Sequence, residues 1–186
     1  MYEIQDFSTL LGTPGFSDGL LNDHFALYGG YVKNVNLLLG KLAETGADTP
    51  EGAELRRRFG WEWNGMRLHE LYFGNLQTGA ETLHDGPLKE RLIAEYGSIE
   101  LWERDFRSVG TMRGIGWVIL SEDPVNGALL NTWVNEHDGG HLAGGKPLLV
   151  MDAFEHAYIR DYGIKRADYI DVFMKAIDWK AVEERL

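Results

Sequence analysis

The 186-residue sequence predicts an α+β fold in two parts: an N-terminal helical hairpin, residues 1–83, followed by a C-terminal domain, residues 84–186, of helices around a three-stranded antiparallel sheet. Two observations lead to this prediction. Apolar residues recur at steps of three and four through the first part of the chain, whereas three short runs typical of β-strands follow between residues 117 and 151. The chain shows no internal repeat, so the two parts are not copies of one unit.

Two long amphipathic helices are expected in the N-terminal part. The first runs from Ser17, which has the side chain of an N-cap, to about Leu42. Its apolar positions are Leu21, Phe25, Tyr28, Val32, Val35, Leu38 and Leu42. The segment Ala43–Glu51 has the composition of a loop. The second helix runs from about Ala53 to Leu76 with a bend at Gly60, and one of its faces holds Met66, His69, Phe73 and Leu76.

Helices and strands are both expected in the C-terminal part. Two helices come first, at Pro87–Tyr96 and Ser98–Val109. The inner face of the second is expected to hold Leu101, Trp102, Phe106 and Val109. Three strands follow, at Trp117–Ser121, Ala128–Asn135 and Pro147–Met151. The last stretch, His156–Leu186, returns to helical periodicity.

Charge and composition exclude several classes of protein. There are 18 Lys and Arg against 29 Asp and Glu, a net charge of −11, so a nucleic-acid backbone would be repelled and an anionic substrate would need a local positive field. The absence of cysteine excludes disulfides, thiolate metal ligands and a cysteine nucleophile. The first residues do not resemble a signal peptide, and no apolar run approaches the length of a membrane span. We therefore expect a cytoplasmic protein with no membrane or nucleic-acid partner.

A carboxylate and an imidazole form the most informative pair in the chain. Asp152 and His156 are four residues apart, directly after the apolar run Leu148–Met151, so both are expected on one side of a helical turn that the run carries into the interior. A buried Asp needs a partner, and a metal ion would supply one. The alternative from spacing alone is a helix N-cap Asp followed by a surface or interface His.

Two further histidines favour the metal site over the N-cap alternative. His24 and His69 each lie on or beside an otherwise apolar helical stripe, whereas His84 and His141 lie in glycine-containing loops, where solvated side chains are expected. One histidine on an apolar face is more often a hydrogen-bonded core residue than a ligand. Three of them together with a strand-end aspartate, and no thiolate, suit iron, manganese or zinc.

The C-terminal stretch MDAFEHAYIRDYGIKRADYIDVFMKAIDW resembles the signature of iron/manganese superoxide dismutases, and HFALYGGYVKNVN, RLHELYF, YGSIELWERDF and GIGWVIL fit the family in order. The resemblance implies one Fe or Mn ion per subunit, bound by His24, His69, Asp152 and His156 together with a solvent molecule. The implied reaction converts superoxide to O2 and hydrogen peroxide while the metal alternates between +3 and +2.

The resemblance also implies roles for neighbouring residues. Tyr31 would stand beside the substrate channel, Trp117 would wall the pocket, and Phe154 replaces the usual tryptophan. Glu155 would reach across the interface of a homodimer or homotetramer to a ligand histidine of the other subunit. His137, which precedes Asp152 by fifteen residues, is expected to donate a hydrogen bond to the metal-bound solvent, with a strand-end structural role as the alternative.

Several departures from the family pattern leave alternatives open. Tyr28 stands where a second histidine is usual, and Tyr31 is seven rather than eight residues after His24, so either tyrosine could line the channel. The run before His69 is shortened to NGMRLH, and Ile159 replaces an interface tyrosine. The rival functions are a non-catalytic structural or binding protein of the same fold and a mononuclear non-haem oxygenase. A third histidine argues against the oxygenase.

Overall fold

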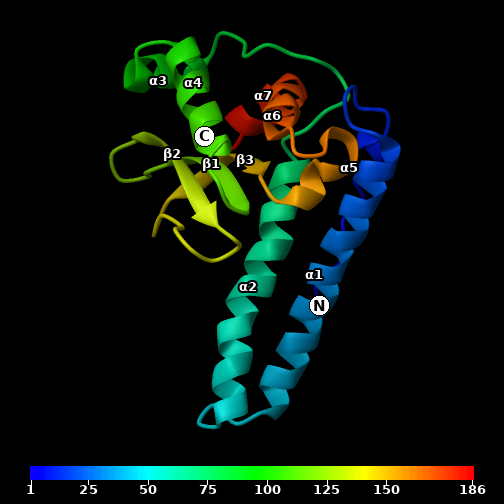
Figure 1. Ribbon diagram of the computed structural model, residues 1–186. Coiled ribbons are helices and arrows are strands. Elements are labelled where there is room, and N and C mark those ends of the chain that lie inside the picture. Colours follow the sequence, from blue (N-terminus) through cyan, green and yellow to red (C-terminus); the bar gives the residue numbers. More distant parts are fainter.

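The computed structural model describes residues 1–186, and it confirms the predicted α+β fold. Two long helices lie side by side and project from a body that contains a small sheet and the remaining helices (Figure 1). No helix is long and apolar enough to cross a membrane. A cluster of 36 buried hydrophobic residues forms the core, and it includes residues of the long helices, the sheet and the C-terminal helices. The division at residues 83 and 84 stays a prediction.

The helical hairpin consists of α1 (Asp18–Glu44) and α2 (Pro50–Phe73). Ser17 is the N-cap of α1, as expected, and its hydroxyl accepts a hydrogen bond from the Leu20 amide at 3.0 Å. Thr49 caps α2 in the same way and Pro50 follows it, which starts the helix three residues earlier than predicted. The loop is therefore shorter than the predicted Ala43–Glu51. Gly60 lies inside an uninterrupted helix.

The sheet lies in the C-terminal part, and its strands are β1 (Gly116–Glu122), β2 (Leu129–Asn135) and β3 (Lys146–Asp152). All neighbours are antiparallel and the order is β2-β1-β3, so β1 is central. Trp117 at the start of β1 pairs with Val134 near the end of β2 and with Asp152 at the end of β3. This register brings side chains far apart in sequence to one end of the sheet.

The other C-terminal helices are short, and they are α3 (Pro87–Tyr96), α4 (Ile99–Gly110), α5 (Ile159–Tyr162), α6 (Arg166–Lys175) and α7 (Trp179–Glu183). One prediction for α4 was wrong, because Leu101 is 40% exposed while Trp102 and Phe106 are buried. The helix is amphipathic, but its apolar stripe is narrower than the pattern suggested.

The expectation that Asp152 and His156 share a helical turn was also wrong. Asp152 is the last residue of β3, and His156 lies in the one-turn 3₁₀-helix η2 (Glu155–Ala157). The step from the end of β3 into this 3₁₀-turn, rather than α-helical spacing, brings the two side chains together. In the site, a short turn therefore positions His156 and the end of a sheet strand positions Asp152.

Candidate metal centre

The helical hairpin contributes two buried imidazoles. His24 on α1 is 1% exposed, and His69 on α2 is fully buried. The Nδ1–H of His69 donates to the carbonyl oxygen of Gly65, one turn earlier, at 2.5 Å. Because a neutral imidazole carries one proton, this bond leaves Nε2 of His69 as the free lone pair. The Phe73 ring packs edge-on against His24, with ring centroids 4.9 Å apart, and restricts its rotation.

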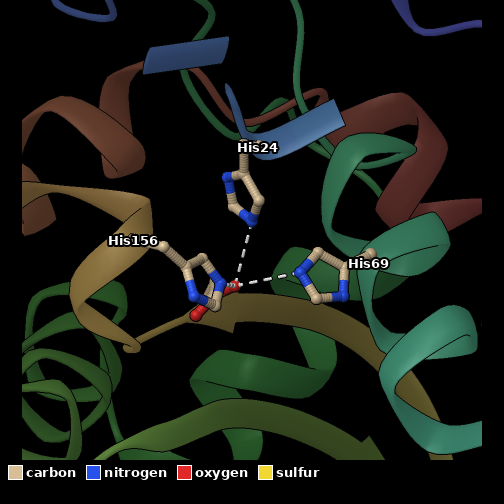
Figure 2. A group of neighbouring side chains, drawn as sticks. His24, His69 and His156 are labelled. Carbon is tan, nitrogen blue, oxygen red and sulfur yellow. Dashed lines mark hydrogen bonds and ion pairs between the residues drawn. The ribbon is translucent and has the colours of Figure 1, made fainter. Parts of the chain in front are cut away.

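Asp152 places a carboxylate at the point where the imidazoles converge. Its Oδ2 lies 3.0 Å from Nε2 of His156, 3.2 Å from Nε2 of His24 and 3.6 Å from Nε2 of His69. Its Oδ1 accepts a hydrogen bond from the Phe154 amide at 2.7 Å, which fixes the orientation of the carboxylate. Figure 2 shows the three histidines, each from a different element, pointing toward one common carboxylate oxygen.

Asp152, His24 and His69 have the protonation states that a metal ion requires. Burial opposes ionisation of Asp152, but the attraction and hydrogen bonds of His156 and His24 outweigh it, and the pKa of the carboxyl lies well below its usual range. Burial lowers the pKa of His24, and burial together with the neighbouring His24 lowers the pKa of His69 further. The site therefore holds an anionic carboxylate beside the neutral imidazoles of His24 and His69, the forms in which both groups act as ligands.

The residues fit one metal ion. One donor atom from each of His24, His69, Asp152 and His156 lies within 4.8 Å of all the others. Nε2 of His69 is buried and has no hydrogen-bond partner, which is costly in a folded protein unless a ligand occupies the lone pair. Three nitrogen donors and one oxygen, without sulfur, suit iron, manganese or zinc. The fold and this site define a protein with a mononuclear metal centre.

A hydrogen-bonded chain of three side chains lies beside the centre. Nε1–H of the buried Trp117 donates to Nδ1 of His137 at 3.1 Å, and Nε2 of His137 lies 2.7 Å from the hydroxyl of Tyr31. Burial lowers the pKa of His137 to about 4, so the ring is neutral near pH 7. Since Nδ1 accepts from Trp117, the ring proton is on Nε2 and His137 donates to Tyr31. The Tyr31 hydroxyl then keeps its own proton for another acceptor.

The structure distinguishes the two tyrosines that the sequence left open. Tyr31 packs against the His69 ring at a centroid distance of 5.2 Å and bonds to His137. The hydroxyl of Tyr28 instead donates to Glu70 at 2.9 Å and accepts from the Gln5 amide at 3.1 Å. Tyr28 therefore ties the N-terminal segment to the hairpin, and Tyr31 is the tyrosine in contact with the chain of hydrogen bonds at the site.

Two residues with a part in the site were not singled out by sequence. Gly65 leaves room for Tyr31, since a Cβ there would lie 2.5 Å from the Tyr31 ring. The Tyr169 hydroxyl donates to the backbone carbonyl of Asp152 at 2.7 Å and so holds the end of β3. The sequence did hold a signal for Gly65, because it lies four residues, about one helical turn, before the candidate ligand His69. The signal for Tyr169 was its place in the run RADY, within the C-terminal stretch that resembles the family signature.

The remaining residues considered from the sequence lie beside the centre or away from it. The Phe154 ring stacks on His137, with centroids 4.7 Å apart, and on His156 at 5.1 Å. Glu155 and Ile159 are exposed. His84 bonds to Glu183 at 2.7 Å and His141 to the carbonyl of His137 at 2.8 Å, so neither joins the cluster. Of the six histidines, three are in the cluster and a fourth is beside it.

Comparison with known proteins agrees with this class of site. The family described as iron/manganese superoxide dismutases, C-terminal domain, matches residues 84–185. A superoxide dismutase [Fe] of Cupriavidus metallidurans is 38% identical over 177 residues, which cover 92% of this chain and 88% of the relative. A superoxide dismutase [Mn] of Haloarcula marismortui is 34% identical, covering 92% and 86%. A superoxide dismutase [Fe] of Aquifex pyrophilus is 34% identical, covering 92% and 84%.

The chain belongs to the iron/manganese superoxide dismutase family. The relatives include proteins named for iron and proteins named for manganese, at similar levels of identity. Its cofactor is accordingly iron or manganese.

Proposed function

We propose that the protein is a superoxide dismutase in which His24, His69, Asp152 and His156 bind one iron or manganese ion. The observation that carries this proposal is the convergence of their four donor atoms, with Nε2 of His69 buried and unpaired, in a chain of this family. When bound, the metal supplies the redox chemistry by alternating between +3 and +2, which lets one superoxide be oxidised and another reduced.

The protein's own residues supply orientation and protons. Asp152, as the only anionic donor, favours the higher charge of the metal, and the Phe154 amide and Tyr169 hold it in place. Reduction of superoxide to hydrogen peroxide consumes two protons. Tyr31 can donate one at its hydroxyl, because His137 donates to that oxygen and leaves the phenolic proton free. The aromatic rings of Phe154 and Trp117 limit the access of water.

Metal analysis and a superoxide-consumption assay on the purified protein test this function together. We expect one equivalent of iron or manganese per chain and dismutation that is lost on chelation and restored by one of these metals. A stably folded protein without metal or activity would instead support the non-catalytic alternative.

Replacing Tyr31 with phenylalanine should keep the metal but lower turnover about tenfold or more, because a positioned proton donor is lost. Burial, with the negative charges of Asp152 and Glu62, raises the pKa of Tyr31 to about 12, so the phenol stays protonated throughout the usual assay range. Stopped-flow turnover measured from pH 7 to 10 checks this. Tyr28→Phe is the control, since its hydroxyl bonds elsewhere. Altered turnover in Tyr28→Phe but not in Tyr31→Phe would reverse the two roles.

A homodimer or homotetramer with Glu155 at its interface is part of the proposal. Glu155 is exposed in the single chain and adjoins His156. If it pairs with a partner's histidine, Glu155→Ala should weaken association at least about 100-fold, because breaking a buried charged pair costs about 3–5 kcal/mol. Sedimentation over a dilution series checks this, with Glu184→Ala as the control for an exposed carboxylate. If association is unchanged in Glu155→Ala, Glu155 does not lie at the interface. An antioxidant role in the cytoplasm stays a prediction.

A further inference from the structure

Glu62 is a buried carboxylate that the dismutation chemistry above does not use. It lies on α2, seven residues before His69, and its side chain is 3% exposed. Its Oε1 accepts hydrogen bonds from Arg58, with Nε at 2.8 Å and Nη2 at 2.5 Å. Its Oε2 accepts from Nδ2 of Asn34 at 3.0 Å, and Asn34 lies on α1 one turn after Tyr31. Glu62 therefore joins the two helices close to the level of Tyr31.

Arg58 connects this carboxylate to the hydrogen-bonded chain through one aromatic ring. Its side chain is 56% exposed, and its guanidinium carbon lies 5.2 Å from the centroid of the Trp61 ring. The Trp61 ring meets the His137 ring edge-on, with centroids 4.8 Å apart. Trp61 thus contacts both the half-exposed guanidinium of Arg58 and the ring of His137, which bonds to Tyr31.

The charges of Arg58 and Glu62 change the pKa of Tyr31 in opposite directions. Burial is the main reason for the high pKa of Tyr31; beyond it, Glu62 and Asp152 raise the pKa and Arg58 lowers it. Arg58 is the one cation among these influences. This matters because the whole chain carries a net charge of −11 and its substrate is an anion. A cation close to the His137–Tyr31 pair can offset that repulsion locally.

We propose that Arg58 is the cation that draws superoxide toward Tyr31, and that Glu62 holds Arg58 against Trp61 while reducing its effective charge. This inference rests on the proposed function, since it names superoxide as the anion. Arg58 acts through the local field and not as a catalytic residue. The side chain of Arg58 is partly exposed to water, so salt screens its charge at distances beyond about 8 Å at physiological ionic strength.

Charge-changing variants separate this role from a structural one, because the two predicted effects have opposite signs. Arg58→Gln should lower kcat/KM for superoxide about two- to fivefold at low ionic strength, and Glu62→Gln should raise it by a similar factor, because it leaves Arg58 without its counter-charge. Both should approach the parent protein at high salt. Arg58→Lys should keep most of the parent value because the charge remains.

The exposed pair Arg57 and Glu54 on the same helix gives matched controls, since both side chains are more than 70% exposed. Arg57→Gln and Glu54→Gln change the net charge equally but should alter kcat/KM much less. Thermal melting of each variant identifies any that unfolds. Glu62→Gln keeps the shape of the side chain and an acceptor oxygen, so it should fold. If it does not, Arg58→Gln still tests the proposal.

The affinity of a small anion, azide, for the metal-loaded protein gives a readout that does not depend on dismutation. Azide should bind more weakly to Arg58→Gln and more tightly to Glu62→Gln at low salt, as followed by the visible spectrum or by titration calorimetry. If both variants lower kcat/KM and azide affinity regardless of salt, Glu62 and Arg58 are structural and the proposal fails. If azide affinity shifts as expected in a protein that does not dismute superoxide, the anion guide stands and the proposed function fails.

Discussion

Asp152→Ala is expected to leave the protein without a bound metal and to reduce dismutation at least about 100-fold. The substitution removes the only anionic donor of the cluster and the acceptor around which His24 and His156 are oriented. Loss of groups that merely orient ligands already costs about 10–100-fold in affinity or activity, so the loss of a ligand should exceed that. Metal content after gel filtration measures the effect directly.

A second measurement separates loss of metal from loss of fold. Metal that binds only the folded state raises stability by about 2.7 kcal/mol when its free concentration is 100 times its Kd. Added iron or manganese should therefore raise the Tm of the metal-free parent protein but not that of Asp152→Ala. Asp152→Asn keeps the shape of the side chain and should lose metal as well, whereas Asp171→Ala removes an exposed carboxylate that pairs with Arg107 and should behave as the parent. Full metal occupancy in both Asp152 variants would show that the ligand assignment is wrong.

His137→Ala is expected to keep the metal but lower turnover about 10–100-fold. The imidazole is not in the cluster, but it is the hydrogen-bond donor to Tyr31 and the acceptor for Trp117. Its removal leaves the buried Nε1–H of Trp117 unpaired, which costs about 1–3 kcal/mol of stability, and lets the Tyr31 hydroxyl reorient. Single-turnover kinetics and metal content of the same samples check both parts.

Two variants test whether the hydrogen bonds of His137 are the cause. A glutamine amide has both an acceptor and a donor, so His137→Gln should recover a large part of the turnover. Trp117→Phe preserves most of the packing but removes the donor that holds the His137 tautomer, and should give an intermediate loss. If His137→Ala matches the parent protein in turnover and in the visible spectrum of its metal, His137 is structural and its hydrogen bonds do not control proton donation by Tyr31.

Much of the fold could be read from local patterns. Helical periodicity located α1 and α2, the Ser17 side chain marked the start of α1, and three apolar runs located the strands within a few residues. These features depend on neighbours three or four residues away, or on alternation along one strand, so a single sequence contains the relevant information. The same periodicity singled out His24 and His69, because each is an imidazole among apolar neighbours.

Features that depend on contacts between distant segments could not be read in this way. Local spacing put Asp152 and His156 on a helical turn, but β3 is held in the sheet up to Asp152 by its register with β1, and that pairing outweighs local helical preference. The choice between Tyr28 and Tyr31 depends on Gln5 and Glu70 around one and on His137 around the other.

The surroundings of the site illustrate the same physical limit. His137 is 106 residues from Tyr31, and the two meet only because α1 packs against the body that contains the end of β2. The pairing of Glu62 with Asn34 likewise requires the two hairpin helices to lie in one particular register. Periodicity gives the face on which a side chain lies, but the position of one face against another is set by packing of the whole core. The sequence alone therefore identified the residues of a metal centre. Only the tertiary contacts determined which partners orient them.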